Sequence, residues 1–222
     1  MSRRGALRYD HVAFDLDGTL VDSRADLAAA TNYVLRSFEL PEIAPTAVYA
    51  LVGEGAWRLV ERALGPARAA VVDEGVERFL AYYAGHLLDA TRLYPGVADA
   101  LQRLADAGVM LSVLTNKPEG LSRTILDGLG IAGHFRALIG GDSLPTRKPD
   151  PAGLEQLRRL GRTALPRMLL VGDSRVDVET AANGGTDFCG VAWGLDPAAL
   201  RAARPSRVID SAADLIGLVR PG

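Results

Sequence analysis

Cysteine is almost absent from this chain of 222 residues. Cys189 is the single cysteine, so a disulfide within the chain is impossible and an oxidising compartment is not indicated. The first ten residues contain arginines but no apolar stretch behind them, which argues against a secretory signal. We therefore expect a cytoplasmic protein.

Long apolar runs and a strong charge imbalance are also missing. No window approaches the roughly 20 consecutive apolar residues that would span a bilayer. The formal net charge is -2, which does not attract polyanions. We expect a soluble monomer or homodimer with no nucleic-acid partner and no membrane partner.

Lysine is scarce among the basic residues. Lys117 and Lys148 are the lysines of the chain, although lysine and arginine together number 25. Lys148 lies between Arg147 and Pro149, in a segment that Pro151 also stiffens just before a predicted helix. We expect Lys148 to be held beside an acidic cluster as a compact positive charge. Lys117 has a similar position, but it could lie at the rim of a site.

Short apolar runs recur along the chain, each followed by polar or glycine residues and then by a helical pattern. This rhythm is typical of buried parallel strands in an alternating β/α chain. We predict the α/β class, with a doubly wound, Rossmann-like and mostly parallel sheet as the core. The runs are residues 11–14, 109–114, 137–139, 168–171, 188–191 and, more weakly, 207–209.

The stretch from residue 23 to residue 91 breaks this rhythm. It holds no convincing strand and three or four helical patterns, one beginning at Ser23, one after Gly55 and one over about 67–88. We predict an inserted all-helical cap domain at 23–91. The α/β core domain then comprises residues 1–22 and 92–222.

Two carboxylates follow the first predicted strand. Side chains alternate along a strand, so Asp15 and Asp17 point to the same side. Gly18 lets the backbone turn tightly, and Thr19 offers a hydroxyl to an anion. From this segment alone, an ordinary Asp-Gly turn with a capping aspartate is the alternative.

Polar residues also follow two other predicted strands. Thr115, Asn116 and Lys117 end the second strand, and Asp173 ends the fourth with Asp177 one helical turn later. In open α/β sheets ligands bind outside the carboxyl ends of the strands. The shared position of these endings favours one site over several unrelated turns and helix caps.

The ordered motifs resemble the haloacid dehalogenase superfamily, and specifically its phosphoglycolate phosphatase-like branch. The resemblance spans nearly the whole chain, including the helical insertion. It is carried by the segments Asp15-Leu16-Asp17-Gly18-Thr19-Leu20-Val21-Asp22-Ser23, Thr115-Asn116-Lys117, Lys148-Pro149 and Gly172-Asp173-Ser174-Arg175-Val176-Asp177.

The resemblance implies a phosphatase that passes through an aspartyl-phosphate intermediate. Asp15 would be the nucleophile, and Asp17 would move protons as general acid and base. Magnesium would be the cofactor, bound by Asp15, by Asp173 and by the backbone carbonyl of Asp17.

The resemblance also assigns the remaining polar residues. Thr115 and Lys148 would hold phosphoryl oxygens, Gly18 and Asn116 would complete the phosphate site, and Asp177 would orient its neighbours from behind them. In the cap domain, Glu54 and Arg58 could face the substrate, although a solvent-facing arginine is the commoner situation.

The expected substrate is a small phosphate monoester, namely 2-phosphoglycolate. Asp17 argues against a dehalogenase, and the absence of lysine from 23–91 argues against a phosphonatase that needs a Schiff-base lysine. A sugar phosphomutase, similar to β-phosphoglucomutase, remains open because it would use the same aspartate pair. A non-enzymatic switch or phosphate sensor also remains open, and turnover of a phosphate monoester would distinguish it.

Overall fold

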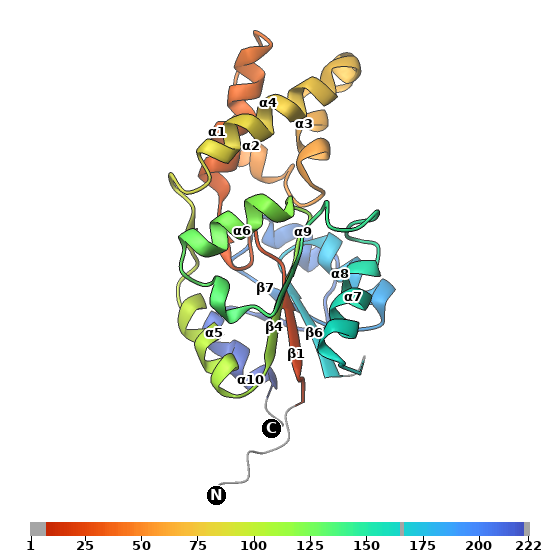
Figure 1. The fold of residues 1–222 in the computed structure, drawn as a ribbon. Coiled ribbons are helices and arrows are strands. Elements are labelled where there is room, and N and C mark those ends of the chain that lie inside the picture. Colours follow the sequence, from red (N-terminus) through yellow and green to blue (C-terminus); the bar gives the residue numbers. More distant parts are fainter. Residues whose placement is uncertain (1–7, 165–166, 220–222) are drawn as a thin grey trace, which may run out of the picture.

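The computed structural model describes residues 8–164 and 167–219. The first seven residues, part of the segment in which no secretory signal was expected, lie outside the described residues. A parallel sheet carries helices on both faces, and a separate group of helices lies beyond the ends of the strands (Figure 1). The α/β, doubly wound fold is therefore confirmed.

The strand order places three chemically important strand ends side by side. The order is β5-β4-β1-β6-β7-β8, and each neighbouring pair is parallel. β1 is central, with β4 on one side and β6 on the other, so the chain reverses its direction of travel across the sheet at β1. The strands are β1 His11–Phe14, β4 Met110–Leu114, β5 Ala137–Ile139, β6 Met168–Gly172, β7 Asp187–Val191 and β8 Val208–Ile209. Each agrees with its predicted run to within one residue at either end.

Alternating side chains of β1 serve two separate cores. Val12 and Phe14 are buried with helices α5, α6 and α10, whereas Ala13 is buried with α7 and α8 on the opposite face (Figure 1). Within residues 8–164 and 167–219, no helix has both the length and the apolar character that a membrane span requires. The helices that surround the sheet are α5 Val97–Asp106, α6 Glu119–Gly128, α7 Ala152–Gly161, α8 Arg175–Gly184, α9 Pro197–Ala202 and α10 Leu215–Val219.

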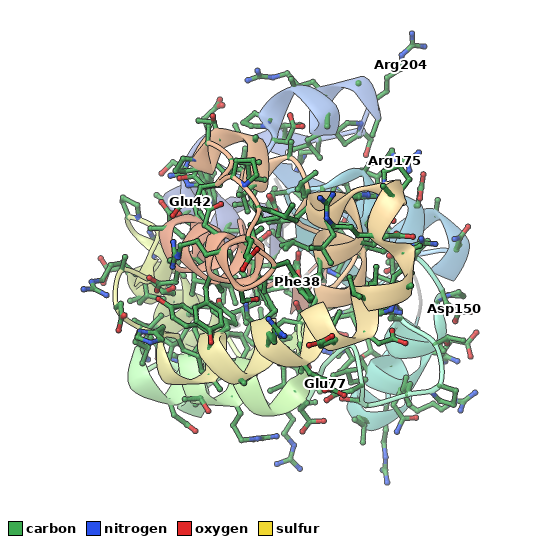
Figure 2. All side chains as sticks on the ribbon, turned by 90° about the horizontal axis from the view of Figure 1, so that it is seen from above. Phe38, Glu42, Glu77, Asp150, Arg175 and Arg204 are labelled. Atoms are coloured by element: carbon green, nitrogen blue, oxygen red, sulfur yellow. The ribbon has the colours of Figure 1, made fainter. Side chains whose placement is uncertain are left out.

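The helical layer, as we call α1 to α4, lies across the carboxyl ends of the strands. Viewed from above, it covers the middle of the molecule, with Phe38 near its centre and Arg204 pointing outward at the margin (Figure 2). The layer is all-helical as expected, while the division of the chain into domains at 22/23 and 91/92 stays a prediction. Its elements are α1 Arg24–Ser37, α2 Pro45–Tyr49, α3 Ala56–Leu64, the 3₁₀ helix η1 Pro66–Val71 and α4 Val72–Gly85.

Three local details of this region differ from the sequence-based expectation. The helix expected over about 67–88 is divided into η1 and α4, because Val71 between them has non-helical dihedral angles, φ -113° and ψ 10°. The second of these helices, α4, ends at Gly85. Ser23 does not cap α1 with its side chain; its hydroxyl donates to Asp17 instead. A short antiparallel ribbon of β2 (Val21–Asp22) and β3 (Arg92–Leu93) was not predicted.

Asp26 ties the start of the helical layer to its end. This buried carboxylate accepts hydrogen bonds from the backbone amides of Ala90 and Thr91 and from the Thr91 hydroxyl, at 2.7–3.1 Å. Charge-assisted hydrogen bonds of this kind are stronger than neutral ones. The clamp fixes where the chain leaves and re-enters the core, next to the end of β1.

Candidate active site

Asp15 lies immediately beyond β1 and is held there by the sheet and by a lysine. Its backbone amide continues the parallel ladder by donating to the carbonyl of Val171. Its carboxylate is buried and receives Lys148 Nζ at 2.8 Å. Burial raises the pKa of Asp15 to about 6, with Lys148 opposing and Asp177 reinforcing the rise. Asp15 is thus an anion in a site that needs additional positive charge.

Lys148 is clamped between two carboxylates. Its ammonium also contacts Asp177 Oδ1 at 2.7 Å, and its side chain is 2% exposed. Burial by itself would lower the pKa of Lys148, but Asp15 and Asp177 raise it above the ordinary value. The other oxygen of Asp177 accepts from the Ser174 amide and hydroxyl in the capping box of α8. Asp177 therefore anchors Lys148 to the start of that helix.

Asp173 completes a group of three buried carboxylates. It offers one oxygen within 4.8 Å of the matching atoms of Asp15 and Asp177. Burial raises the pKa of Asp173 well above its ordinary value, and the two neighbouring carboxylates add to the rise. Among the residues that the structure describes, Lys148 is the cation bound to this group, so negative charge is in excess. Oxygen donors with excess negative charge suit a divalent cation such as magnesium.

Gly18 provides the space for Asp173. Its backbone has φ +83°, and a Cβ at this position would lie 2.2 Å from Asp173 Oδ2. Asp173 is further fixed by the amide of Leu195 at 2.8 Å and by the hydroxyl of Thr19 at 3.1 Å. The carboxylate is consequently held in one orientation beside Asp15, as a metal ligand must be.

The carboxylate of Asp17 is not one of these three grouped carboxylates. It accepts from Ser23 Oγ at 2.6 Å and from Lys117 Nζ at 2.9 and 2.8 Å. Lys117 also donates to the hydroxyl of Tyr83, which α4 of the helical layer supplies. The side chain of Lys117 is 4% exposed, so it lies inside the site and not at its rim. Burial by itself would lower the pKa of Lys117, but Asp17 and Tyr83 raise it above the ordinary value.

Thr115 and Asn116 follow β4 next to Asp15. Thr115 is buried and lines a cavity between the strand ends and the helical layer. Its hydroxyl accepts from the Lys117 amide. The Asn116 amide nitrogen donates to the carbonyls of Gly53 and Lys148, both at 3.0 Å. This side chain thereby joins a loop of the helical layer to the loop of Lys148, and the expected place of Asn116 in the phosphate site stays a prediction.

A cavity of about 220 Å³ lies between the helical layer and the strand ends. Its lining includes Glu54, which accepts from Arg62 at 2.5 Å, but not Arg58 among the described residues. The sequence left open whether Arg58 faces the substrate or the solvent. The guanidinium of Arg58 pairs with Glu61 and lies over the Trp57 ring outside the cavity. Arg62, one turn further along α3, borders the cavity in its place.

Comparison with known proteins decides the family. Residues 12–191 match the model of the haloacid dehalogenase-like hydrolases. The chain belongs to this family. It is 42% identical over 205 residues to a phosphoglycolate phosphatase of Pseudomonas putida, covering 90% of this chain and 75% of that protein. It is 40% identical over 222 residues to a phosphoglycolate phosphatase of Rhodospirillum rubrum, covering 95% and 92%.

A solved structure agrees with this assignment. The crystal structure of a predicted phosphoglycolate phosphatase from Haemophilus somnus superposes with a TM-score of 0.88 at 32% identity, covering 95% of this chain and 98% of the other. The expected resemblance to the phosphoglycolate phosphatase-like branch is therefore confirmed.

Sequence reasoning missed two side chains that shape the site of this haloacid dehalogenase-like hydrolase. Tyr83 falls within the helical pattern predicted over about 67–88, which assigned it no role in the site, although its hydroxyl accepts from Lys117. Ser23 was treated as a helix cap, although it binds Asp17. The position of Ser23 six residues after Asp17 gave no signal of this contact, because it depends on how the chain folds back beyond Gly18.

Proposed function

We propose that this protein hydrolyses 2-phosphoglycolate with magnesium as cofactor. The observation that carries the proposal is the pairing of Asp15 with Lys148 beside Asp173 at the carboxyl edge of the sheet. The two curated relatives described above are phosphoglycolate phosphatases that match 90–95% of this chain, which supports the choice of substrate.

Asp15 is proposed as the nucleophile. Its oxygen would form a bond to phosphorus while the bond from phosphorus to the ester oxygen breaks, giving an aspartyl phosphate. Lys148 would neutralise the charge on the phosphoryl oxygens, and Thr115 would donate its hydroxyl to them. The contact of Lys148 with Asp177 supports this role, because it keeps the ammonium in place when Asp15 is consumed.

Asp17 is proposed as the group that moves protons. It would give a proton to the departing glycolate oxygen, and it would later take a proton from the water that attacks the aspartyl phosphate. That water releases inorganic phosphate and restores the Asp15 carboxylate. A magnesium ion bound by Asp15, Asp173 and the Asp17 carbonyl would neutralise charge on the transferring group.

The helical layer is proposed to be a cap that closes over the substrate. Asn116, Lys117 and Tyr83 already connect it to the core, and the Asp26 clamp provides a fixed base for its movement. Closure would exclude bulk water from the aspartyl phosphate. We also propose a cytoplasmic location and a monomeric or homodimeric state.

The proposal is tested by phosphate release from a panel of monoesters. The panel contains 2-phosphoglycolate, ethyl phosphate, glucose 1-phosphate, pyridoxal phosphate and a nucleoside monophosphate, each with magnesium and with EDTA. We expect magnesium-dependent release that is fastest with 2-phosphoglycolate. Conversion of glucose 1-phosphate to glucose 6-phosphate without release would instead identify a phosphomutase, and no release from any ester would exclude a phosphatase.

The metal site has a test that does not depend on turnover. Magnesium should raise the unfolding temperature of the wild type in proportion to the logarithm of its concentration above the dissociation constant. At about 100 times that constant the stabilisation is about 3 kcal/mol, or roughly 5–10 °C for a chain of this size. Asp173→Asn should abolish the rise, and an unchanged rise would reject Asp173 as a ligand.

A further inference from the structure

We propose that Lys117 binds the carboxylate of the substrate and so selects phosphate esters that carry a second anionic group next to the ester oxygen. This inference rests on the proposed phosphatase function and names the residue that recognises the non-reacting part of the substrate. In the proposed phosphoryl transfer, Lys117 neither reacts nor contacts the phosphoryl group.

Burial distinguishes Lys117 from the other cations that line the cavity in the described part of the chain. Its side chain is 4% exposed, whereas those of Arg62 and Arg175 are 39% and 66% exposed. Arg62 pairs with Glu54, and Arg175 pairs with Glu179. Arg175 lies near the margin of the helical layer when the molecule is seen from above (Figure 2). A substrate carboxylate would have to compete with a glutamate at either arginine. Lys148 is buried as well, but its ammonium is already paired with Asp15 and Asp177. Of the three cations that line the cavity in the described part of the chain, Lys117 is the buried one.

The hydrogen bonds of Lys117 place it next to the position of the ester oxygen. The ammonium lies 2.8–2.9 Å from both oxygens of Asp17 and 2.9 Å from the Tyr83 hydroxyl. These three hydrogen bonds use all three hydrogens of the ammonium. To reach the ester oxygen, a carboxylate oxygen of Asp17 must leave this arrangement. At least one ammonium hydrogen is then free for another acceptor.

2-Phosphoglycolate supplies that acceptor at the right place. Its carboxylate carbon is two covalent bonds from the ester oxygen. An ester oxygen that is hydrogen-bonded to Asp17 therefore places the carboxylate beside Lys117, which contacts Asp17. An ester without a carboxylate leaves a buried ammonium short of one acceptor, and such a loss is costly. Selection by an unpaired buried group is stronger than selection by size alone.

The surroundings of Lys117 strengthen the expected contact. Its ammonium lies 4.6 Å from the centroid of the Tyr83 ring, and Phe79 and Leu27 also line the cavity. Apolar walls exclude water, so a charge-assisted hydrogen bond formed there is weakened little by solvent. The substrate carboxylate and Tyr83 would then both bind Lys117, which links recognition of the substrate to the position of α4.

The experiment compares 2-phosphoglycolate with ethyl phosphate, which lacks the carboxylate. Lys117→Met should lower the ratio of the two kcat/KM values by at least about 30-fold, the size expected for one charge-assisted hydrogen bond. The ratio is the readout, because loss of the Asp17 contact alone would slow both substrates equally. Lys117→Arg should restore part of the ratio. Lys117→Gln replaces Lys117→Met if circular dichroism shows that the latter is not folded.

Two matched variants test the competing cations. Arg62→Met and Arg175→Met should each keep the wild-type ratio within about threefold. An unchanged ratio in Lys117→Met, or a collapse of the ratio in either arginine variant, would overturn the inference. Failure of the wild type to hydrolyse 2-phosphoglycolate would instead reject the proposed substrate, so the two failures are distinguishable.

Discussion

His11 makes the stability of the strand that carries Asp15 dependent on pH. It begins β1, is fully buried, and its Nε2 lies 2.8 Å from the Ser112 hydroxyl on β4. Nδ1 is buried without a hydrogen-bond partner among the described residues. A proton added to this ring would therefore bring a charge and a second N–H donor into a place that has no acceptor for it.

The size of the effect follows from the pKa. Burial lowers the pKa of His11 from 6.5 to about 4, whereas the unfolded chain keeps the ordinary value. As pH falls below 6.5 the unfolded state binds the proton first, so the free energy of unfolding decreases until the pH passes the folded value. The full loss is about 3 kcal/mol, and about 2 kcal/mol of it occurs by pH 5.

Urea unfolding of the wild type and of His11→Gln, at pH 7.5 and pH 5 in EDTA, measures this contribution. Other acids titrate in both proteins, so the difference between their pH dependences isolates His11. We expect His11→Gln to lose about 2 kcal/mol less than the wild type over this interval. His134→Gln, at a half-buried position in η2 (Ala132–His134), controls for the removal of a histidine. Equal losses in the wild type and His11→Gln would refute the reasoning.

Three further predictions concern the site and the Asp26 clamp of the helical layer. Gly18→Ala should weaken magnesium binding at least about tenfold, because its methyl group would collide with Asp173, while Gly130→Ala, with a similar φ and open space, should not; titration of the thermal shift measures both. Asp15→Asn should lower kcat below about one thousandth of the wild-type value and keep the fold, since Lys148 retains Asp177; residual activity above this level would reject Asp15 as nucleophile. Asp26→Ala should cost about 3 kcal/mol in urea unfolding, because it leaves the amide of Thr91 without its acceptor; a loss under about 1 kcal/mol would show that the clamp is dispensable.

The strands of the core could be predicted because burial on both faces leaves a continuous apolar run. Residues 11–14 and 137–139 coincide with β1 and β5. The ribbon of β2 and β3 escaped prediction, because a strand of two residues is too short to show any period. The break between η1 and α4 also escaped prediction. Apolar spacing continues through it, whereas the interruption lies in the backbone of Val71, which has non-helical dihedral angles.

The candidate site was predictable where a residue follows a strand and unpredictable where it depends on a loop. Asp15 and Asp173 end neighbouring strands, so the sheet alone brings them together. Lys117 follows a strand as well, but the direction of its side chain is set by Asp17 and by Tyr83, 34 residues earlier in the chain. Arg58 and Arg62 show the same difficulty. Both lie on α3, and local pairing with Glu61 or Glu54 decides which one borders the cavity.

The scarcity of lysine acquires a physical explanation in the site. Each lysine holds one of the two aspartates that follow β1: Lys148 contacts Asp15, and Lys117 contacts Asp17. Each ammonium has acceptors from two different residues: Asp15 and Asp177 at Lys148, and Asp17 and Tyr83 at Lys117. A compact ammonium with three donors can satisfy such a set, whereas the planar guanidinium of arginine presents its donors in one plane and needs more space. Arginine can therefore serve the exposed ion pairs, whereas the positions of Lys117 and Lys148, which are buried in the described part of the chain, favour lysine.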